Sequence, residues 1–375
     1  MIFTSEFPPG PGGIGTHAFE LADNLSRMRY EVGVLCEQHY ADAKRIHDFN
    51  AQLTFPVIGL THASRNSITK FSRRVHKLIE LVRRHNKEVV IASGSSALWC
   101  TAFASLFVNF KMVAIAHGGE LTFTSIPSRL FTRFSFRISD LVIGVSKFTA
   151  SYLPSSLTPR KVKVINNGAN HYLFQKSGIQ NDLKRKYGFE GKRVLLTVGS
   201  VTERKGQDTV IKALPKCKAE VTNIIYVMAG RSDYYDMFKE MARQERVSDE
   251  VFFRGSVDTS EIIELYNLAD IYILNSRHSA HGDFEGFGIS VIEAALCGLP
   301  SIVSKNSGLE EAIVDGITGL AIEPDNPNET AKAIVRLFKN DQLRMEMGEA
   351  ARQRAHSQFT WESITKQYSE VLDAL

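Results

Sequence analysis

The chain has 375 residues, of which 43% are hydrophobic and 23% charged, with a formal net charge of +4. This length is sufficient for two domains with separate cores, and the composition excludes an intrinsically disordered protein. The sequence contains no run with the length and hydrophobicity of a membrane span, and no basic N-terminal segment leads into an apolar one. We therefore expect no signal peptide and a cytoplasmic location.

Cysteine spacing gives no sign of cross-linking. The four cysteines are far apart, none belongs to a C-x-x-C pair, and each lies in an apolar segment: Cys36, Cys100, Cys217 and Cys297. The sequence predicts buried, reduced thiols, and neither a disulfide framework nor a zinc site.

Short apolar runs alternate with amphipathic stretches along the whole chain. These runs are residues 31–36, 88–93, 111–117, 140–146, 161–166, 193–199, 223–230, 250–255, 270–275 and 300–304. The alternation predicts an α/β protein with parallel sheets covered by helices on both faces. A turn-rich segment at 166–175 interrupts it, so we expect one Rossmann-like domain over 1–168 and a second over 169–356. An amphipathic helix over 357–375 follows and can pack back on the first domain or on the second.

Positive charge is concentrated in the first half. Residues 1–170 contain 20 Lys and Arg against 11 Asp and Glu, whereas the remainder contains 25 against 30. Much of the excess lies in residues 64–87, where only Glu80 opposes the cations Arg65, Lys70, Arg73, Arg74, Lys77, Arg83, Arg84 and Lys87. Phe71, Val75, Leu78 and Val82 recur there at helical spacing, which predicts an amphipathic helix. Its basic face is either simply solvated or attracts anionic lipid or an acidic acceptor.

The segment Gly10-Pro-Gly-Gly-Ile-Gly15 has the spacing G-x-G-x-x-G, and Glu37 follows at about the place of an acidic ribose ligand. Pro9 and Pro11 restrict the turn that a dinucleotide fingerprint needs, so this pattern alone is a weak indication of nucleotide binding. A dehydrogenase remains an alternative, which a change in nicotinamide absorbance would support.

The most informative segment is residues 275–304. An apolar run ends there, a polar loop covers 276–284, and a helix is expected from Gly288 to Gly298. Unpaired amides at the start of that helix form an anion site at the carboxyl edge of a parallel sheet, contributed by Gly286, Phe287, Gly288 and Ile289. Glu285 precedes this site and Glu293 follows it within apolar surroundings, where an unpaired carboxylate is costly. A ligand with hydroxyls on both sides of a diphosphate would suit this arrangement.

The pattern Glu285-Gly-Phe-Gly, with seven residues between Glu285 and Glu293, resembles the E-x7-E signature of retaining glycosyltransferases of family GT4, which have the GT-B fold. Three further segments are similar to parts of that family in the same order. They are "TVGSVTERKGQDTVIKAL", "NSGLEEAIVDGITGLAIEPDN" with Glu311, Gly316 and Gly319, and "EFPPGPGGIGTH". The similarity covers nearly the whole chain and implies two Rossmann-like domains that face a cleft, with the acceptor in the first and the donor in the second.

The resemblance also implies roles for individual residues. Donor binding is expected at Gly13, Gly199, Arg204, Lys205, Gly255, Glu285, Gly286, Phe287, Gly288, Ile289 and Glu293. Catalytic roles are expected for His117, Arg204, Lys205 and Glu285. Acceptor contacts are expected at Gly15, His17 and Glu120, although His17 can equally cap a helix or lie on the surface, and Glu120 can simply start a helix.

The implied activity is transfer of a sugar from a nucleoside diphosphate sugar, most simply a UDP- or GDP-sugar, to a glycan or lipid-linked acceptor with retained configuration. No D-x-D pair occurs in the sequence, so we expect no metal and no other cofactor, and we expect no nucleic-acid partner. The basic first half favours peripheral contact with the inner face of a membrane and a role in polysaccharide, lipopolysaccharide or glycolipid synthesis. Two alternatives are another GT-B enzyme, such as a sugar-nucleotide epimerase or a phosphorylase, and a nucleotide-sugar-binding subunit without turnover.

Two departures from the family pattern affect these expectations. Ser200 stands where most relatives have arginine, so Arg204 would have to reach the same phosphate. The first strand also begins a few residues later than is usual, which leaves open whether Met1 is the original start.

Overall fold

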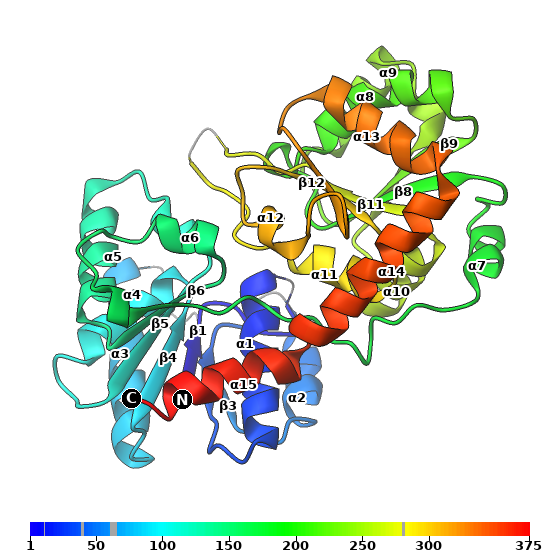
Figure 1. Cartoon of the computed structure of the whole chain (residues 1–375). Helices are drawn as coiled ribbons and strands as arrows, with labels where there is room; N and C mark the ends of the chain where they lie inside the picture. Colours follow the sequence, from blue (N-terminus) through cyan, green and yellow to red (C-terminus); the bar gives the residue numbers. More distant parts are fainter. Residues whose placement is uncertain (11, 39–40, 61–65, 280–281) are drawn as a thin grey trace. The chain divides into compact units, whose positions relative to one another are not determined.

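The computed structural model describes residues 1–10, 12–38, 41–60, 66–279 and 282–375 (Figure 1). The chain forms two compact units. Unit 1 contains residues 1–168 and 361–375, and unit 2 contains residues 169–360. The last crossing lies beyond residue 356 because helix α14 continues to Gln358, and the ring of Phe359 packs against Phe287 of unit 2 with centroids 5.6 Å apart.

In the described residues, unit 1 has one parallel sheet of seven strands in the order β3-β2-β1-β4-β5-β6-β7. The strands are β1 (Ile2–Thr4), β2 (Val34–Cys36), β3 (Val57–Gly59), β4 (Val89–Ser93), β5 (Lys111–Ala116), β6 (Leu141–Gly144) and β7 (Val162–Val164). The helices are α1 (Gly13–Arg27), α2 (Ala43–Asn50), α3 (Ser67–Arg84), α4 (Ser95–Ala104), α5 (Ile126–Ile138), α6 (Lys147–Ser151) and α15 (Trp361–Leu372). Two single turns, η1 (Gly119–Leu121) and η2 (Pro159–Lys161), complete the unit.

Unit 2 has a second parallel sheet, of six strands among the residues described, in the order β10-β9-β8-β11-β12-β13. The strands are β8 (Arg193–Val198), β9 (Ile224–Ala229), β10 (Val251–Gly255), β11 (Ile271–Leu274), β12 (Ser301–Ser304) and β13 (Gly319–Ile322). The helices are α7 (Gln180–Lys186), α8 (Gln207–Glu220), α9 (Tyr235–Gln244), α10 (Thr259–Leu268), α11 (Ile289–Leu296), α12 (Leu309–Ala312), α13 (Pro327–Lys339) and α14 (Asp341–Gln358). Two further turns are η3 (Glu203–Lys205) and η4 (Ser248–Glu250).

Both sheets are covered by helices on two faces, as Figure 1 shows. In unit 1, α3, α4 and α5 pack in a row, while α15 packs on α1. In unit 2, α8 packs with α9 and α13, whereas α11 packs with α12 and α14. Each sheet reverses its strand order once, between β1 and β4 in unit 1 and between β8 and β11 in unit 2. In such sheets ligands bind beyond the carboxyl ends of the strands at this switch point.

The predicted α/β architecture is confirmed, and each apolar run forms a strand. Three strands lie outside those runs: β1, which the sequence indicates only as a short first strand, and β3 and β13, which are short edge strands, β3 being only partly buried. The predicted basic helix is α3, which buries Val75, Leu78 and Val82, while Arg65 lies outside the described residues. All four cysteines are buried free thiols, as predicted. Within the described ranges, no helix is both long enough and apolar enough to cross a membrane.

Candidate active site

In unit 2, the switch point is formed by the loops that follow β8 and β11. The chain leaves β8 through Gly199, makes the turn η3, and enters α8 through Gly206. Gly206 has φ +71°, and a Cβ atom there would lie 1.7 Å from the carbonyl oxygen of Asn275 at the end of β11. Only glycine satisfies both conditions, so the glycine after Lys205 allows the two loops to meet.

This close approach brings Arg204 and Lys205 to Glu285. Arg204 donates from Nη1 to Glu285 Oε2 at 2.7 Å, and Lys205 Nζ donates to the same oxygen at 2.6 Å. The Glu285 side chain is 14% exposed. Although burial alone would raise its pKa, the two cations outweigh it and lower the pKa of Glu285 to about 2. The carboxylate is therefore ionised throughout the physiological pH range, and the structure brings together three residues for which the sequence predicts donor binding.

The start of α11 lies next to this ion pair in the sequence. Gly288 caps the helix with φ +84° and no side-chain hydrogen bond. In the part of the chain that the structure describes, the backbone N–H groups of Phe287, Gly288 and Ile289 donate no hydrogen bond. Gly308 packs so closely that a Cβ atom there would lie 1.9 Å from the carbonyl oxygen of Gly286, and its N–H donates to the Glu285 carbonyl at 3.0 Å. Free amides at a helix start favour an anion.

Glu293 is not the unpaired carboxylate that its apolar neighbours suggest. Tyr266 donates from its hydroxyl to Glu293 Oε2 at 2.8 Å, which orients the carboxylate and lowers the cost of its burial. Tyr272 donates to Ser290 Oγ at 2.7 Å, and both Glu285 and Glu293 contribute to raising the Tyr272 pKa after burial, the largest cause. Tyr272 therefore lies within electrostatic range of the two carboxylates. Sequence reasoning missed both tyrosines, because a tyrosine in an apolar segment indicates only core packing.

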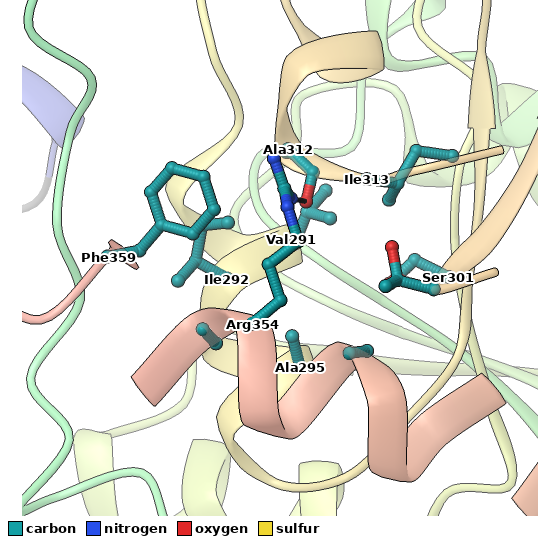
Figure 2. Close-up of a pocket in the computed structure, with 11 residues that line it drawn as sticks. Val291, Ile292, Ala295, Ser301, Ala312, Ile313, Arg354 and Phe359 are labelled. Carbon is teal, nitrogen blue, oxygen red and sulfur yellow. Dashed lines mark hydrogen bonds between the residues drawn. The ribbon is translucent and has the colours of Figure 1, made fainter. Parts of the chain in front are cut away.

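The face of α11 that carries Val291, Ile292 and Ala295 is fixed by packing, as Figure 2 shows. Val291, Ile292 and Ala295 of α11 lie beside Arg354 of α14. Arg354 donates to the carbonyl oxygens of Ala312 at 2.8 Å and Glu311 at 2.9 Å, and its guanidinium lies over the Phe359 ring at 4.7 Å. These hydrogen bonds satisfy carbonyl groups at the C-terminal end of α12. They also fix α12 and α14, the two helices against which α11 packs. The space in Figure 2 is thus part of the support behind the site and not the site itself.

The other two residues of unit 2 that are predicted to bind the donor, Gly199 and Gly255, lie at the same edge of the sheet. A Cβ atom on Gly199 would lie 3.9 Å from Lys205 Nζ, so this glycine adjoins the cation. Gly255 ends β10, has φ +73° and open space around it, and accepts a hydrogen bond from the Gly230 N–H at 2.8 Å. Ser200, at the position of the family arginine, accepts from the Gln207 side chain at 3.1 Å through its carbonyl oxygen.

In unit 1 the glycine-rich loop leads from β1 into α1. Gly13 is the exposed first residue of α1, and Gly15 is buried where a Cβ atom would be 3.2 Å from the Phe7 backbone nitrogen. Pro11 lies outside the described residues. Glu37 is 7% exposed and pairs with Arg74 at 2.6 Å, so it already has a partner in the protein and offers no support for a dinucleotide site.

His17 is neither a cap nor a surface residue. Its side chain is fully buried, and its Nε2 lies 3.1 Å from the Tyr368 hydroxyl of α15. The His17 ring also meets the His117 ring edge-on, with centroids 5.1 Å apart. Burial, together with His117, lowers the pKa of His17 well below its usual value, so the ring is neutral. The expectation of capping or surface exposure is wrong because the C-terminal helix covers this position.

His117 follows β5 at the carboxyl edge of the unit 1 sheet. Its Nε2 lies 2.8 Å from Ser93 Oγ, and its backbone N–H donates to the Glu120 carboxylate. Burial lowers the pKa of His117 to about 4, so the imidazole is neutral at physiological pH. Glu120 belongs to the turn η1 and is 2% exposed. Across the described ranges, no group of three His, Cys, Asp or Glu side chains is placed to hold a metal ion.

Two sequence families match the chain. The family "Glycosyl transferases group 1" matches residues 179–354, and "Glycosyltransferase Family 4" matches residues 11–172. A curated relative from Mycobacterium tuberculosis, GDP-mannose-dependent alpha-(1-6)-phosphatidylinositol monomannoside mannosyltransferase, is 25% identical over 99% of this chain and 97% of its own length. N-acetyl-alpha-D-glucosaminyl L-malate synthase of Bacillus anthracis is 24% identical over 97% of this chain and 94% of its own length.

Solved structures agree in fold. Anabaena Alr3699/HepE, solved with UDP and glucose, superposes with a TM-score of 0.85 at 23% identity, over 100% of this chain and 99% of that protein. The lipopolysaccharide glycosyltransferase WaaG has a TM-score of 0.74 at 17% identity, over 99% of each chain. The solved structures show the GT-B fold, and the two family matches together with the curated relatives show that the chain belongs to glycosyltransferase family 4 and is a glycosyltransferase with a nucleotide-sugar donor.

Proposed function

We propose that this enzyme transfers a hexose from a UDP- or GDP-sugar to a glycan or lipid-linked acceptor with retention of anomeric configuration and without a metal ion. The observation that carries the proposal is the cluster at the β8/β11 switch point. Two cations, one ionised carboxylate and the free amides of α11 lie together there, and a second carboxylate on α11 is oriented by Tyr266.

The chemistry follows from the charge that develops as the donor bond breaks. When the bond between the anomeric carbon and phosphate opens, negative charge accumulates on the leaving diphosphate, and cations with amides aimed at it lower the barrier. Arg204, Lys205 and the amides of Gly288 and Ile289 supply this stabilisation. The diphosphate then shares both cations with Glu285, whose carboxylate stays ionised and accepts hydrogen bonds from sugar hydroxyls. Glu293 accepts from the ribose hydroxyls.

His117 serves as a neutral partner of the transferred sugar. Its low pKa keeps it uncharged, so it can exchange hydrogen bonds with a hydroxyl without adding a positive charge near the anomeric carbon. Retention follows if the leaving phosphate itself accepts the proton of the acceptor on the same face of the sugar. The names of the curated relatives include a GDP-mannose donor and a phosphatidylinositol mannoside acceptor, which supports the lipid-linked alternative.

The test is a donor screen by thermal shift, followed by product analysis. UDP-, GDP- and ADP-sugars are added to the purified protein, and the sugar nucleotides with one of these bases should raise the melting temperature. At a hundredfold excess of ligand over Kd, binding stabilises the folded protein by about 2.7 kcal/mol. NMR of the product then reports the anomeric configuration, and transfer is repeated with EDTA. An inverted product contradicts retention, loss of transfer in EDTA contradicts metal independence, and the absence of any donor-dependent shift or transfer contradicts the proposal as a whole.

A further inference from the structure

Arg277 follows strand β11 and has no role in the function proposed above, yet it is hydrogen-bonded to the turn η3 that carries both cations. Its backbone N–H donates to the carbonyl oxygen of Arg204 at 2.8 Å. Its side chain is 19% exposed. A guanidinium that is mostly withdrawn from water needs polar partners, and the partners of Arg277 indicate what it does.

The guanidinium of Arg277 bridges the first turn of α8 and the segment that leads into α13. Nη2 donates to Asp208 Oδ1 at 2.8 Å, Nη1 donates to Thr209 Oγ1 at 3.4 Å, and Nη1 also pairs with Asp325. The Asp208 side chain is 9% exposed. The planar guanidinium can hold two carboxylates in a fixed geometry, which a flexible ammonium group does less well. Arg277 therefore fixes the end of β11 relative to the start of α8.

The charge around Arg277 is balanced, in contrast to the charge at the predicted diphosphate site. Lys212 Nζ lies 3.5 Å from Asp208 Oδ2, so Arg277 and Lys212 are opposed by two carboxylates, those of Asp208 and Asp325. The two cations of η3, however, share a single carboxylate. An excess of positive charge attracts an anion, and Arg277 contributes no such excess.

The loop that carries the cations is held at its other end by Gln207. The Gln207 side chain donates to the Ser200 carbonyl oxygen at 3.1 Å and accepts from the Thr202 N–H at 3.3 Å. Residues 199–206 contain two cations, both of them in η3, and Ser200 adds none. The direction in which these cations point thus depends on a few hydrogen bonds, those of Gln207 on one side and that of Arg277 on the other.

We propose that Arg277 is a positioning residue for the donor diphosphate. Its side chain, anchored on Asp208 and Asp325, fixes the backbone N–H that holds Arg204, so that both cations of η3 point to the place where the diphosphate binds. This inference rests on the proposed function, because it concerns the same diphosphate. Loss of the guanidinium would leave two carboxylates without their shared partner and would release the turn.

The first experiment measures the preference for a diphosphate over a monophosphate. Thermal-shift titrations of the full chain give the Kd of UDP, UMP, GDP and GMP, and the pair with the base that binds is used. Arg277→Met should lower this preference about tenfold, equivalent to about 1.4 kcal/mol, because misplaced cations lose their contact with the second phosphate. An equal loss of affinity for both nucleotides would indicate a merely structural role and would overturn the proposal.

Arg193→Met is the matched control. Arg193 begins β8, the same strand that leads to η3, but it lies at the opposite edge of the sheet, where its Nη1 donates to Asp341 Oδ1 at 2.6 Å. Removing this ion pair should leave the diphosphate preference unchanged. If Arg193→Met lowers the preference as much as Arg277→Met, the effect does not depend on η3 and the proposal is wrong.

The second experiment separates position from charge. Asp208→Ala removes a negative charge from the neighbourhood of the diphosphate, so a direct electrostatic role of Arg277 predicts tighter diphosphate binding. A positioning role predicts weaker binding, because Arg277 loses its partner on α8. Tighter binding would therefore overturn the proposal, and Asp208→Ala also decides the question if Arg277→Met does not fold.

Arg277→Lys keeps the charge but not the planar guanidinium. Its preference for the diphosphate should lie between those of Arg277→Met and the unsubstituted protein, because the ammonium group replaces only part of the bridge. A preference equal to that of the unsubstituted protein would show that charge alone is sufficient. If the unsubstituted protein binds neither UDP nor GDP, the proposed function fails; if it binds one of them and Arg277→Met keeps the full preference, only the role of Arg277 fails.

Discussion

The two sheets share the order of six strands, to which unit 1 adds β7 at one edge, but they carry different kinds of polar group at their carboxyl edges. In unit 2 the edge is ionic, with Arg204 and Lys205 paired to Glu285, whose pKa is lowered to about 2. In unit 1 the residue that follows β5 is a neutral imidazole, His117, which lies next to His17 and whose pKa burial lowers to about 4. Under the proposed function, the same fold would serve anion binding in one unit and hydroxyl binding in the other, according to the residues in its loops.

The most direct way to break this comparison is to remove a cation from the edge of unit 2. Lys205→Ala should lower kcat by about 10²–10³ at saturating donor, because a charged donor aimed at the leaving group is lost. Steady-state kinetics measures the effect. Lys239→Ala is the matched control, since Lys239 is 51% exposed and pairs only loosely with Asp236 at 3.9 Å. Equal turnover in both variants would show that the ionic edge does not take part in the reaction.

Acid should weaken unit 1 before unit 2. The folded pKa of His117, about 4, lies below its ordinary 6.5, so stability present above pH 6.5 is lost as the pH falls toward 4, by up to about 3 kcal/mol. The pKa of Glu285 is also lowered, to about 2, from an ordinary value of 4.5. The stability that Glu285 contributes to unit 2 is therefore lost only as the pH falls below about 4.5.

Urea titrations can follow the two units separately, because both tryptophans belong to unit 1 while circular dichroism reports both units. From about pH 7 to about pH 5, the midpoint by tryptophan emission should fall, and His117→Gln should reduce that fall. A midpoint independent of pH in this interval would contradict the lowered pKa of the His117 imidazole.

Unit 2 also holds a cation, Arg354, that we expect to stabilise the fold without taking part in the reaction. Removing it separates this structural role from the catalytic role expected for Lys205. Arg354→Met removes hydrogen bonds to the carbonyls of Glu311 and Ala312 and should destabilise unit 2 by about 2 kcal/mol. Thermal unfolding by circular dichroism measures this. Arg243→Met, at a side chain that is 68% exposed, should change stability little. If kcat, corrected for the fraction of folded protein, also falls in Arg354→Met, Arg354 takes part in the reaction.

The smallest effect is expected at the second carboxylate. Glu293→Gln should raise the KM for the donor about tenfold with little change in kcat, because it acts on the ribose in both the ground state and the transition state. Tyr266→Phe should act in the same direction but less strongly, since it only orients Glu293. If kcat falls and KM does not change, Glu293 contacts the reacting sugar.

Much of the fold follows from sequence because its signal is local. Apolar runs of four to six residues mark strands such as β5 and β9, which are buried throughout their inner parts. The three-residue β3 lies at the edge of its sheet and is partly exposed, so it leaves no comparable signal. The helix α11 is predictable from its flanking glycines, Gly288 and Gly298, both of which adopt positive φ.

The site is only partly accessible from sequence, because its decisive contacts are long-range. Glu285 and Lys205 are recognisable individually, but their pairing depends on β8 and β11 being neighbours in the sheet. Tyr266 and Tyr368 carry no mark that separates a hydrogen-bonding tyrosine from a core residue. His17 looks like a residue at an exposed helix start until α15, from the other end of the chain, covers it.

That last helix gives the two units different histories during synthesis. Unit 2 is one continuous segment, residues 169–360, whereas unit 1 lacks α15 until residues 361–375 leave the ribosome. Until then, α1 has an uncovered apolar face, and His17 has no hydroxyl partner. Unit 2, all of whose residues precede α15, can thus fold without the last helix, and a released chain truncated after Thr360 should show a protease-resistant unit 2 beside a cleavable unit 1.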